Sequence, residues 1–307
     1  MISRIWRVAV AVLFLSASLS AQAPPAAKAE PEEPDFAFVS GSAYTQVKKS
    51  LQVIHQTAFG TRRVADLLGA RNDDAFLFFQ RVEYGITDRW ELDVIFPAAG
   101  SRTRRNGTTV SRDYGMADAV IGTRYRMLDE ENSPVTIAMG PQIILPSGSV
   151  QKGTGLGGTG LAWDVSVSKD WGGPAFLFNT FNYHVIPSGD DTTPRSSKKF
   201  SLHGTTWATA IGLRPLERSA KDGSKHDLHG FLEAGGNWQQ SVDPGVATGT
   251  RAGELAWTFA PGLRYGYITS RKTLVEIGVS VPIGLGPNGP KRGVIIQFQI
   301  EKLFGEK

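Results

Sequence analysis

One stretch of the chain, residues 76–97 (FLFFQRVEYGITDRWELDVIFP), limits the possible folds more than any other. Apolar and polar residues alternate along both halves, with many β-branched and aromatic side chains, which predicts two β-strands joined by a tight turn. Tyr84 and Trp90 share the apolar face only if paired residue numbers add up to an even number. We therefore expect a turn with an odd number of residues, either 86–88 or 85–89, for which Gly85 can supply a positive φ.

The opposite face of this hairpin is charged. Arg81 and Glu83 on the first strand, and Glu91 and Asp93 on the second, would all lie on one side. Two classes of fold accept such a hairpin. A soluble β-sandwich places the charges in water, whereas a membrane β-barrel places them in its interior and turns the apolar face to lipid.

The first residues indicate export. Arg4 and Arg7 precede a short apolar run at residues 8–20, and small residues follow, which predicts a signal peptide of residues 1–21. The apolar run is too short for a membrane-spanning helix. Residues 22–43 are rich in Pro, Ala and Glu and are expected to form a disordered linker. Residues 44–307 remain for the folded domain.

Composition excludes several classes of function. The sequence has no cysteine, so we expect no disulfides and neither zinc nor thiol chemistry. A formal net charge of +4 is too small to imply a nucleic-acid partner. Thirty-five glycines and 10% aromatic residues, spread over short alternating segments, favour an all-β protein.

Strand patterns recur to the end of the chain, and most are close to the length of about 9–11 residues that a tilted strand needs to cross a bilayer. Short turns follow the second, fourth, sixth and tenth strands, and longer polar loops follow the odd-numbered ones; only the long link at 215–227 breaks this order. The alternation is typical of outer-membrane barrels, so we expect an all-β, antiparallel transmembrane β-barrel of about twelve strands. The expected strands are residues 44–59, 75–86, 89–96, 116–127, 135–145, 161–169, 175–186, 200–213, 228–240, 254–267, 273–283 and 293–304.

Residue parity assigns the two faces of the sheet. Val275, Ile277 and Val279 form one of several apolar stripes expected to face lipid, whereas the parity of Phe176 and Phe178 is ambiguous. Charged side chains of the opposite parity would line the lumen, where they either pair and close it or border a water-filled conduit. These candidate lumen-lining residues are Arg81, Glu83, Glu91, Asp93, Asp118, Arg124, Arg126, Asp164, Glu233, Glu254, Arg264 and Glu276.

Three segments carry a family resemblance: EYGITDRWELDVIFP at 83–97, GMADAVIGTRYRM at 115–127, and IAMGPQIILPSG at 137–148, which a glycine-rich loop follows. Together they resemble the outer-membrane proteins labelled for the meta-pathway of phenol degradation. The resemblance implies a Gram-negative outer-membrane barrel that admits aromatic or other hydrophobic compounds.

Signals for catalysis or for a cofactor are weak. The loop at 153–160 (GTGLGGTG) contains G-x-G-x-x-G, but it precedes a strand instead of opening a helix, so we expect a loop and no nucleotide cofactor. His226 and His229 could reach a cation, yet no third ligand stands at a recognisable spacing, so no metal site is expected. An outer-membrane lipid-modifying enzyme would need a Ser beside a His, and none is evident. We expect no enzyme activity.

Function then rests on the barrel. The expected function is passive uptake of small molecules, with hydrophobic or aromatic compounds favoured by the resemblance. The alternative is a structural or surface-interaction barrel whose lumen is closed by ion pairs. Expected partners are outer-membrane lipid, the barrel-assembly machinery and lipopolysaccharide, whose phosphates suit the arginines of one outer loop. These are Arg102, Arg104, Arg105 and Arg112, for which a solvated loop without a partner is the equal alternative.

Overall fold

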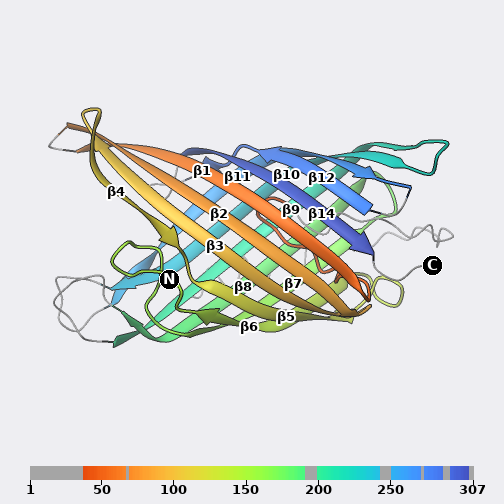
Figure 1. The fold of residues 1–307 in the computed structure, drawn as a ribbon, viewed down its shortest axis with the longest axis horizontal. Coiled ribbons are helices and arrows are strands. Elements are labelled where there is room, and N and C mark those ends of the chain that lie inside the picture. The colour runs from red at the N-terminus through yellow and green to blue at the C-terminus, as the bar shows by residue number, and fades with distance from the viewer. Residues whose placement is uncertain are drawn as a thin grey trace.

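The chain folds into a closed antiparallel β-barrel (Figure 1). The computed structural model describes residues 37–66, 69–190, 199–242, 250–270, 273–285 and 291–303. The predicted signal peptide and residues 22–36 of the predicted linker lie outside these ranges. No helix in the described parts of the chain has the length and apolar character needed to cross a membrane.

The predicted all-β barrel of twelve strands is confirmed. The fourteen labelled elements make up twelve barrel strands, because two of these strands are divided: β4 and β5 together pair with the length of β3, and the short β13 continues the edge of β12. The elements are β1 (Ser50–Asp66), β2 (Gly69–Thr87), β3 (Trp90–Arg105), β4 (Thr108–Met116), β5 (Ala119–Leu128), β6 (Thr136–Leu145), β7 (Gly160–Asp170), β8 (Ala175–Asp190), β9 (Lys199–Ser219), β10 (Lys225–Val242), β11 (Thr250–Ile268), β12 (Thr273–Ser280), β13 (Ile283–Gly284) and β14 (Arg292–Leu303).

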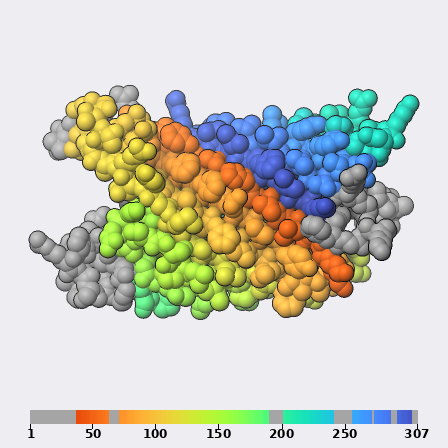
Figure 2. Space-filling model, viewed as in Figure 1, coloured from red at the N-terminus to blue at the C-terminus, as the bar shows by residue number. Residues whose placement is uncertain are grey.

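Pairing of the first strand with the last closes the barrel. β1 pairs with β14 from Ser50↔Leu303 to Thr61↔Arg292, and the orange β1 and dark blue β14 run side by side in Figure 2. Because every strand then has two neighbours over its shared length, backbone N–H and C=O groups are satisfied within the sheet. That is the condition for placing β-structure in lipid.

The two faces of the sheet differ as the alternation predicts. Ile277 and Val279 of β12 are 56% and 47% exposed, whereas Glu276 on the same strand, with the opposite parity, is 2% exposed. Trp90, Tyr125 and Trp171 are exposed near the ends of strands that short turns join, where an aromatic girdle is expected. Phe176 and Phe178 are fully buried while Phe181 and Tyr183 are exposed, which settles the ambiguous parity of β8.

The β2–β3 turn shows what parity can and cannot predict. Tyr84 pairs with Leu92 and Glu83 with Asp93, so paired numbers add up to an even number, as expected. The register is nevertheless displaced by one pair from both predicted turns. A bulge between Gly85 and Thr87 lets Thr87 pair with Trp90, and only Asp88 and Arg89 lie outside the strands. The bulge leaves Ile86 of β2 without a cross-strand partner, so the parity of the pairing changes only at Thr87 and Trp90, next to the turn.

Strands extend further than predicted on the side of the long loops. The expected loop after the third strand is largely the β3–β4 hairpin, which turns at Asn106 (φ 48°) and Gly107 (φ 85°). Positive φ at both positions is the requirement that an Asn-Gly pair meets. The long link predicted at 215–227 is wrong: β9 continues to Ser219 and β10 begins at Lys225, so a short turn follows the eighth barrel strand as well.

The start of the barrel also differs from the prediction. The first strand begins at Ser50, not at residue 44, and the chain before it lies inside the barrel (Figure 1). Residues 37–43 belong to the predicted disordered linker, yet Ala37, Phe38, Ser40, Ser42 and Ala43 are buried. Disorder is therefore the wrong expectation for this part of the linker. We call residues 37–49 the inner segment.

Candidate functional site

The inner segment is held in the lumen by a buried carboxylate on β10. Glu233 accepts hydrogen bonds from three consecutive backbone N–H groups: Phe38 (2.9 Å), Val39 (2.8 Å) and Ser40 (2.9 Å). Glu233 itself is 0% exposed. Consecutive backbone N–H groups form an anion-binding concavity, and here the anion is the barrel's own side chain. Hydrogen bonds of this charge-assisted kind are among the stronger ones in proteins.

Further contacts follow the inner segment around the wall. Gly41 and the hydroxyl of Thr180 exchange hydrogen bonds of 2.9 and 2.8 Å, and the N–H of Ala43 donates to the Ser168 hydroxyl at 2.7 Å. The N–H of Gln46 donates to Glu91 at 2.7 Å. The segment thus contacts β10, β8, β7 and β3 in turn before Lys49 donates to the carbonyl of Gly85 at 2.8 Å.

One end of the inner segment also packs against aromatic rings. Phe38 lies edge-on to Phe231 at 5.8 Å between ring centroids, and Phe231 lies 5.8 Å from Phe176. Phe178 completes this buried cluster, against which Tyr44 is partly buried. The interior therefore contains an apolar core as well as charges. The interior of an outer-membrane barrel is usually polar, so the apolar core is unusual.

A layer of ion pairs fills the neighbouring part of the lumen. Arg81 pairs with Glu83 at 2.7 Å and with Asp93 at 3.0 Å. Arg124 pairs with Glu91 at 2.5 Å, and it donates to the Ser42 carbonyl of the inner segment at 2.6 Å. All of these charged groups are at least nine-tenths buried, so the arginines and carboxylates neutralise one another away from bulk water.

The structure places the other predicted lumen-lining residues differently from one another. Asp164, Glu233, Arg264 and Glu276 are buried in the interior, and Arg264 pairs with Glu276 at 3.3 Å. The following three do not join them. Asp118 accepts hydrogen bonds from the N–H groups of Gly148 and Leu156 and so anchors the β6–β7 loop. Arg126 is half-buried and pairs with Asp129. Glu254 lies in β11, but its side chain is not among those that the structure describes.

The short turn at 129–135 contributes a second acidic anchor. Glu130 accepts hydrogen bonds from the Tyr44 hydroxyl at 3.1 Å and from the Asp170 N–H at 2.9 Å, and it pairs with Lys169. Partial burial raises the pKa of the Glu130 carboxyl above its usual value, against the effect of these partners. Its contact with Tyr44 ties the inner segment to the short-turn end of the barrel.

Comparisons with known proteins support the fold. No protein-family model matches the chain, and no curated protein matches it. Among solved structures it is similar to the COG4313 outer membrane channel from Pseudomonas putida F1, with 12% identity and a TM-score of 0.57 over 89% of this chain and 100% of that chain. It is also similar to the β domain of the Bordetella autotransporter BrkA, with 8% identity and a TM-score of 0.52 over 84% of this chain and 100% of that chain. At such identities the likeness shows the fold alone, and the resemblance to the phenol meta-pathway proteins stays an expectation.

Proposed function

We propose that this protein is a small-molecule channel of a Gram-negative outer membrane, closed in this structure by its own inner segment. The observation that carries the proposal is the attachment of residues 38–40 to Glu233 inside a complete barrel. In outer-membrane barrels short turns face the periplasm. The inner segment and the ion-pair layer would then occupy the periplasmic half of the lumen.

A channel with this arrangement conducts only when the inner segment moves. The segment precedes β1 and takes part in no strand of the barrel, so it can leave without breaking the sheet. The cluster of Phe38, Phe176, Phe178 and Phe231 would then face the lumen and offer an apolar surface to a solute. This agrees with hydrophobic or aromatic substrates, which the sequence resemblance also favours.

A second candidate is a structural or surface-interaction barrel whose lumen stays closed. The ion-pair layer favours it, because Arg81 and Arg124 saturate carboxylates on two strands, β2 and β3, and would resist hydration. The two candidates differ in what happens once the inner segment is removed. The lumen of a channel would then conduct ions, whereas the lumen of a structural barrel would stay closed.

Planar-bilayer recording tests the proposal. The wild-type protein should show rare, brief openings, and Glu233→Gln should raise the open probability, because the amide NH₂ would face N–H donors that now meet a carboxylate. Deletion of residues 37–46 should give sustained conductance that phenol or benzoate reduces. Asp164→Asn is the matched control, since Asp164 is a buried inward carboxylate that accepts a hydrogen bond from the Ser166 hydroxyl, and its effect on the open probability should be much smaller than that of Glu233→Gln. Silence in the deletion variant, with the barrel folded, would instead establish the closed structural barrel.

A further inference from the structure

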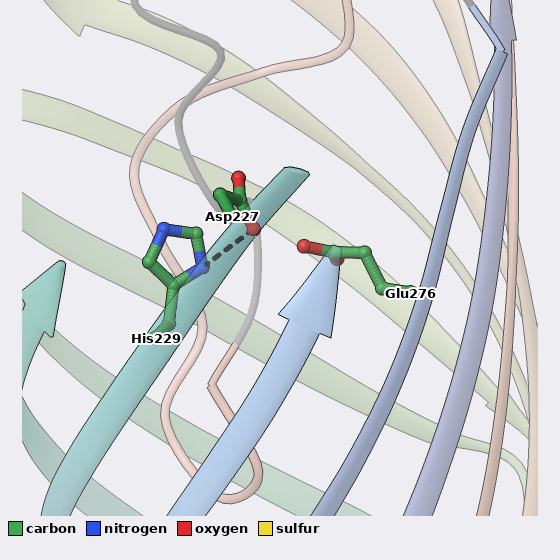
Figure 3. Close-up of side chains that lie close together, drawn as sticks. All are labelled: Asp227, His229 and Glu276. Atoms are coloured by element: carbon green, nitrogen blue, oxygen red, sulfur yellow. Dashed lines mark ion pairs between the residues drawn. The ribbon is translucent and has the colours of Figure 1, made fainter. Parts of the chain in front are cut away.

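Three ligand-type side chains meet in the barrel interior beside the inner segment, at a place distinct from the Glu233 attachment (Figure 3). They are Asp227 and His229 on β10 and Glu276 on β12. One nitrogen or oxygen of each lies within 4.8 Å of the corresponding atoms of the other two. We propose that this cluster is a binding site for a divalent transition-metal ion of the zinc class.

Strand register explains the convergence. Asp227 pairs with Gly266 of β11, and Gly266 pairs with Glu276 of β12, so the three positions form one row across the sheet. A Cβ on Gly266 would lie 2.4 Å from Asp227 Oδ1, so the absence of a side chain there makes room for the Asp227 carboxylate. His229 follows Asp227 by two residues and therefore faces the same side of the sheet.

His229 is the residue whose surroundings indicate a bound ion. His229 is 2% exposed, and its Nδ1 makes no hydrogen bond within the described part of the chain. Nδ1 is directed at Asp227 Oδ1 at 3.7 Å, a separation too long for a hydrogen bond. The ring is held edge-on to Phe176 and near Phe231, with centroids 5.9 and 6.2 Å away, so its direction is fixed by packing. A buried imidazole nitrogen that is fixed in place without a donor or acceptor suits a metal ligand.

The donor set selects the class of ion. One imidazole nitrogen with two carboxylates suits Zn²⁺ and similar ions, whereas Ca²⁺ and Mg²⁺ require more oxygen ligands or several waters. Zinc bound at about 2.1 Å needs donors roughly 3.5 Å apart, close to the present distance from His229 to Asp227. Arg264 pairs with Glu276 through Oε1 at 3.3 Å, so the arginine and a bound ion would share this carboxylate.

The other acidic group of the interior provides a contrast. Glu83, Glu91 and Asp93 also lie close enough to hold an ion. Arg81 and Arg124, however, pair with all three carboxylates, and no imidazole is present. We therefore expect a cation to bind the cluster of Asp227, His229 and Glu276 and not this group.

Calorimetric titration of ZnCl₂ into the chelator-treated protein, folded in detergent and carrying no histidine tag, tests the proposal. The wild type should bind one equivalent. His229→Phe, which keeps a ring between Phe176 and Phe231, and Asp227→Asn should each weaken binding by more than about tenfold. His226→Gln is the matched control: this histidine lies three residues away on the same strand, is half-buried and is hydrogen-bonded to the Tyr265 hydroxyl instead of facing the cluster, so binding should be unchanged. Unheated and boiled samples on a gel verify that each variant is folded. Absence of saturable binding in the wild type, or equal weakening by His226→Gln and His229→Phe, would overturn the metal site.

Binding should also respond to pH and to the identity of the ion. Zinc requires a neutral imidazole and ionised carboxylates, so the affinity should fall as the solution is acidified. Mg²⁺ at the same concentration should give no heat beyond dilution. Binding of Mg²⁺ as tight as that of Zn²⁺ would show that the cluster attracts any divalent cation electrostatically, and it would contradict the assignment.

Discussion

Val279 and Glu276 lie three positions apart on β12, yet they face opposite media. Val279 is 47% exposed on the outer face, whereas Glu276 is buried and paired with Arg264. A charge on the outer face would meet lipid, and loss of a charge on the inner face would leave its partner uncompensated. Both changes carry a cost, but for different reasons.

Val279→Arg should lower the free energy of unfolding by about 2–4 kcal/mol, because it places a guanidinium near the middle of the apolar band. Val110→Arg is the control: Val110 is 58% exposed on β4, beside other arginines of the β3–β4 hairpin and away from that band, so the change should be within about 0.5 kcal/mol of neutral. Urea titration of the protein folded in lipid vesicles measures both. Equal costs would mean that the outer face of β12 is assigned to the wrong medium.

At the scale of elements, glycines in the barrel wall make room for the inner segment. Phe38 lies over Gly262 of β11 and Gly278 of β12, where an added Cβ would approach its ring to 2.5 and 2.7 Å. At the other end, a Cβ on Gly85 would lie 1.9 Å from the Val47 carbonyl oxygen. The wall therefore fits the segment sterically as well as through Glu233, and the two attachments can be separated by substitution.

Gly278→Val should release the inner segment while leaving Glu233 in place. Because the chain has no cysteine, Ala43→Cys provides a single reporter at a position that is 0% exposed. Burial of a Phe side chain is worth about 1.5–3 kcal/mol, so displacing Phe38 should speed maleimide labelling of the reporter by roughly ten- to a hundredfold.

Gly230→Val is the control for this measurement, since among the described residues a Cβ there would meet only Leu263, at 3.8 Å. Its labelling rate should equal that of the Ala43→Cys parent. A rate for Gly278→Val that also equals the parent would contradict the steric role of the two glycines.

At the scale of the whole molecule, alternation of residues predicted most of the barrel, because a wall between lipid and a polar lumen imposes period two on every strand. Predicted and observed strands therefore agree best where both faces matter, as at β6 and β7. Beyond the apolar band that constraint is absent, and the long β3–β4 hairpin was missed although Asn106-Gly107 signals it. The inner segment was missed for another reason: its small and polar residues resemble a linker, and its partners are up to 195 residues away. The Asp227–His229–Glu276 cluster likewise depends on register across three strands, which spacing along β10 alone does not reveal.

Closure of the barrel depends on β14. β14 pairs with β12 on one side and with β1 on the other. The intact protein, folded in detergent, should migrate faster on a gel when unheated than after boiling, because a barrel without free edges resists the detergent of the gel. A chain truncated before residue 292 would leave β1 and β12 with unpaired edges. It should therefore show a single, heat-independent band and aggregate when detergent is diluted. A conservative change within the same strand, Ile296→Val on its outer face, should keep the heat-dependent shift. A truncated chain that still shows the shift would mean that the remaining strands close without β14, and a wild-type protein that lacks it would contradict the closed barrel.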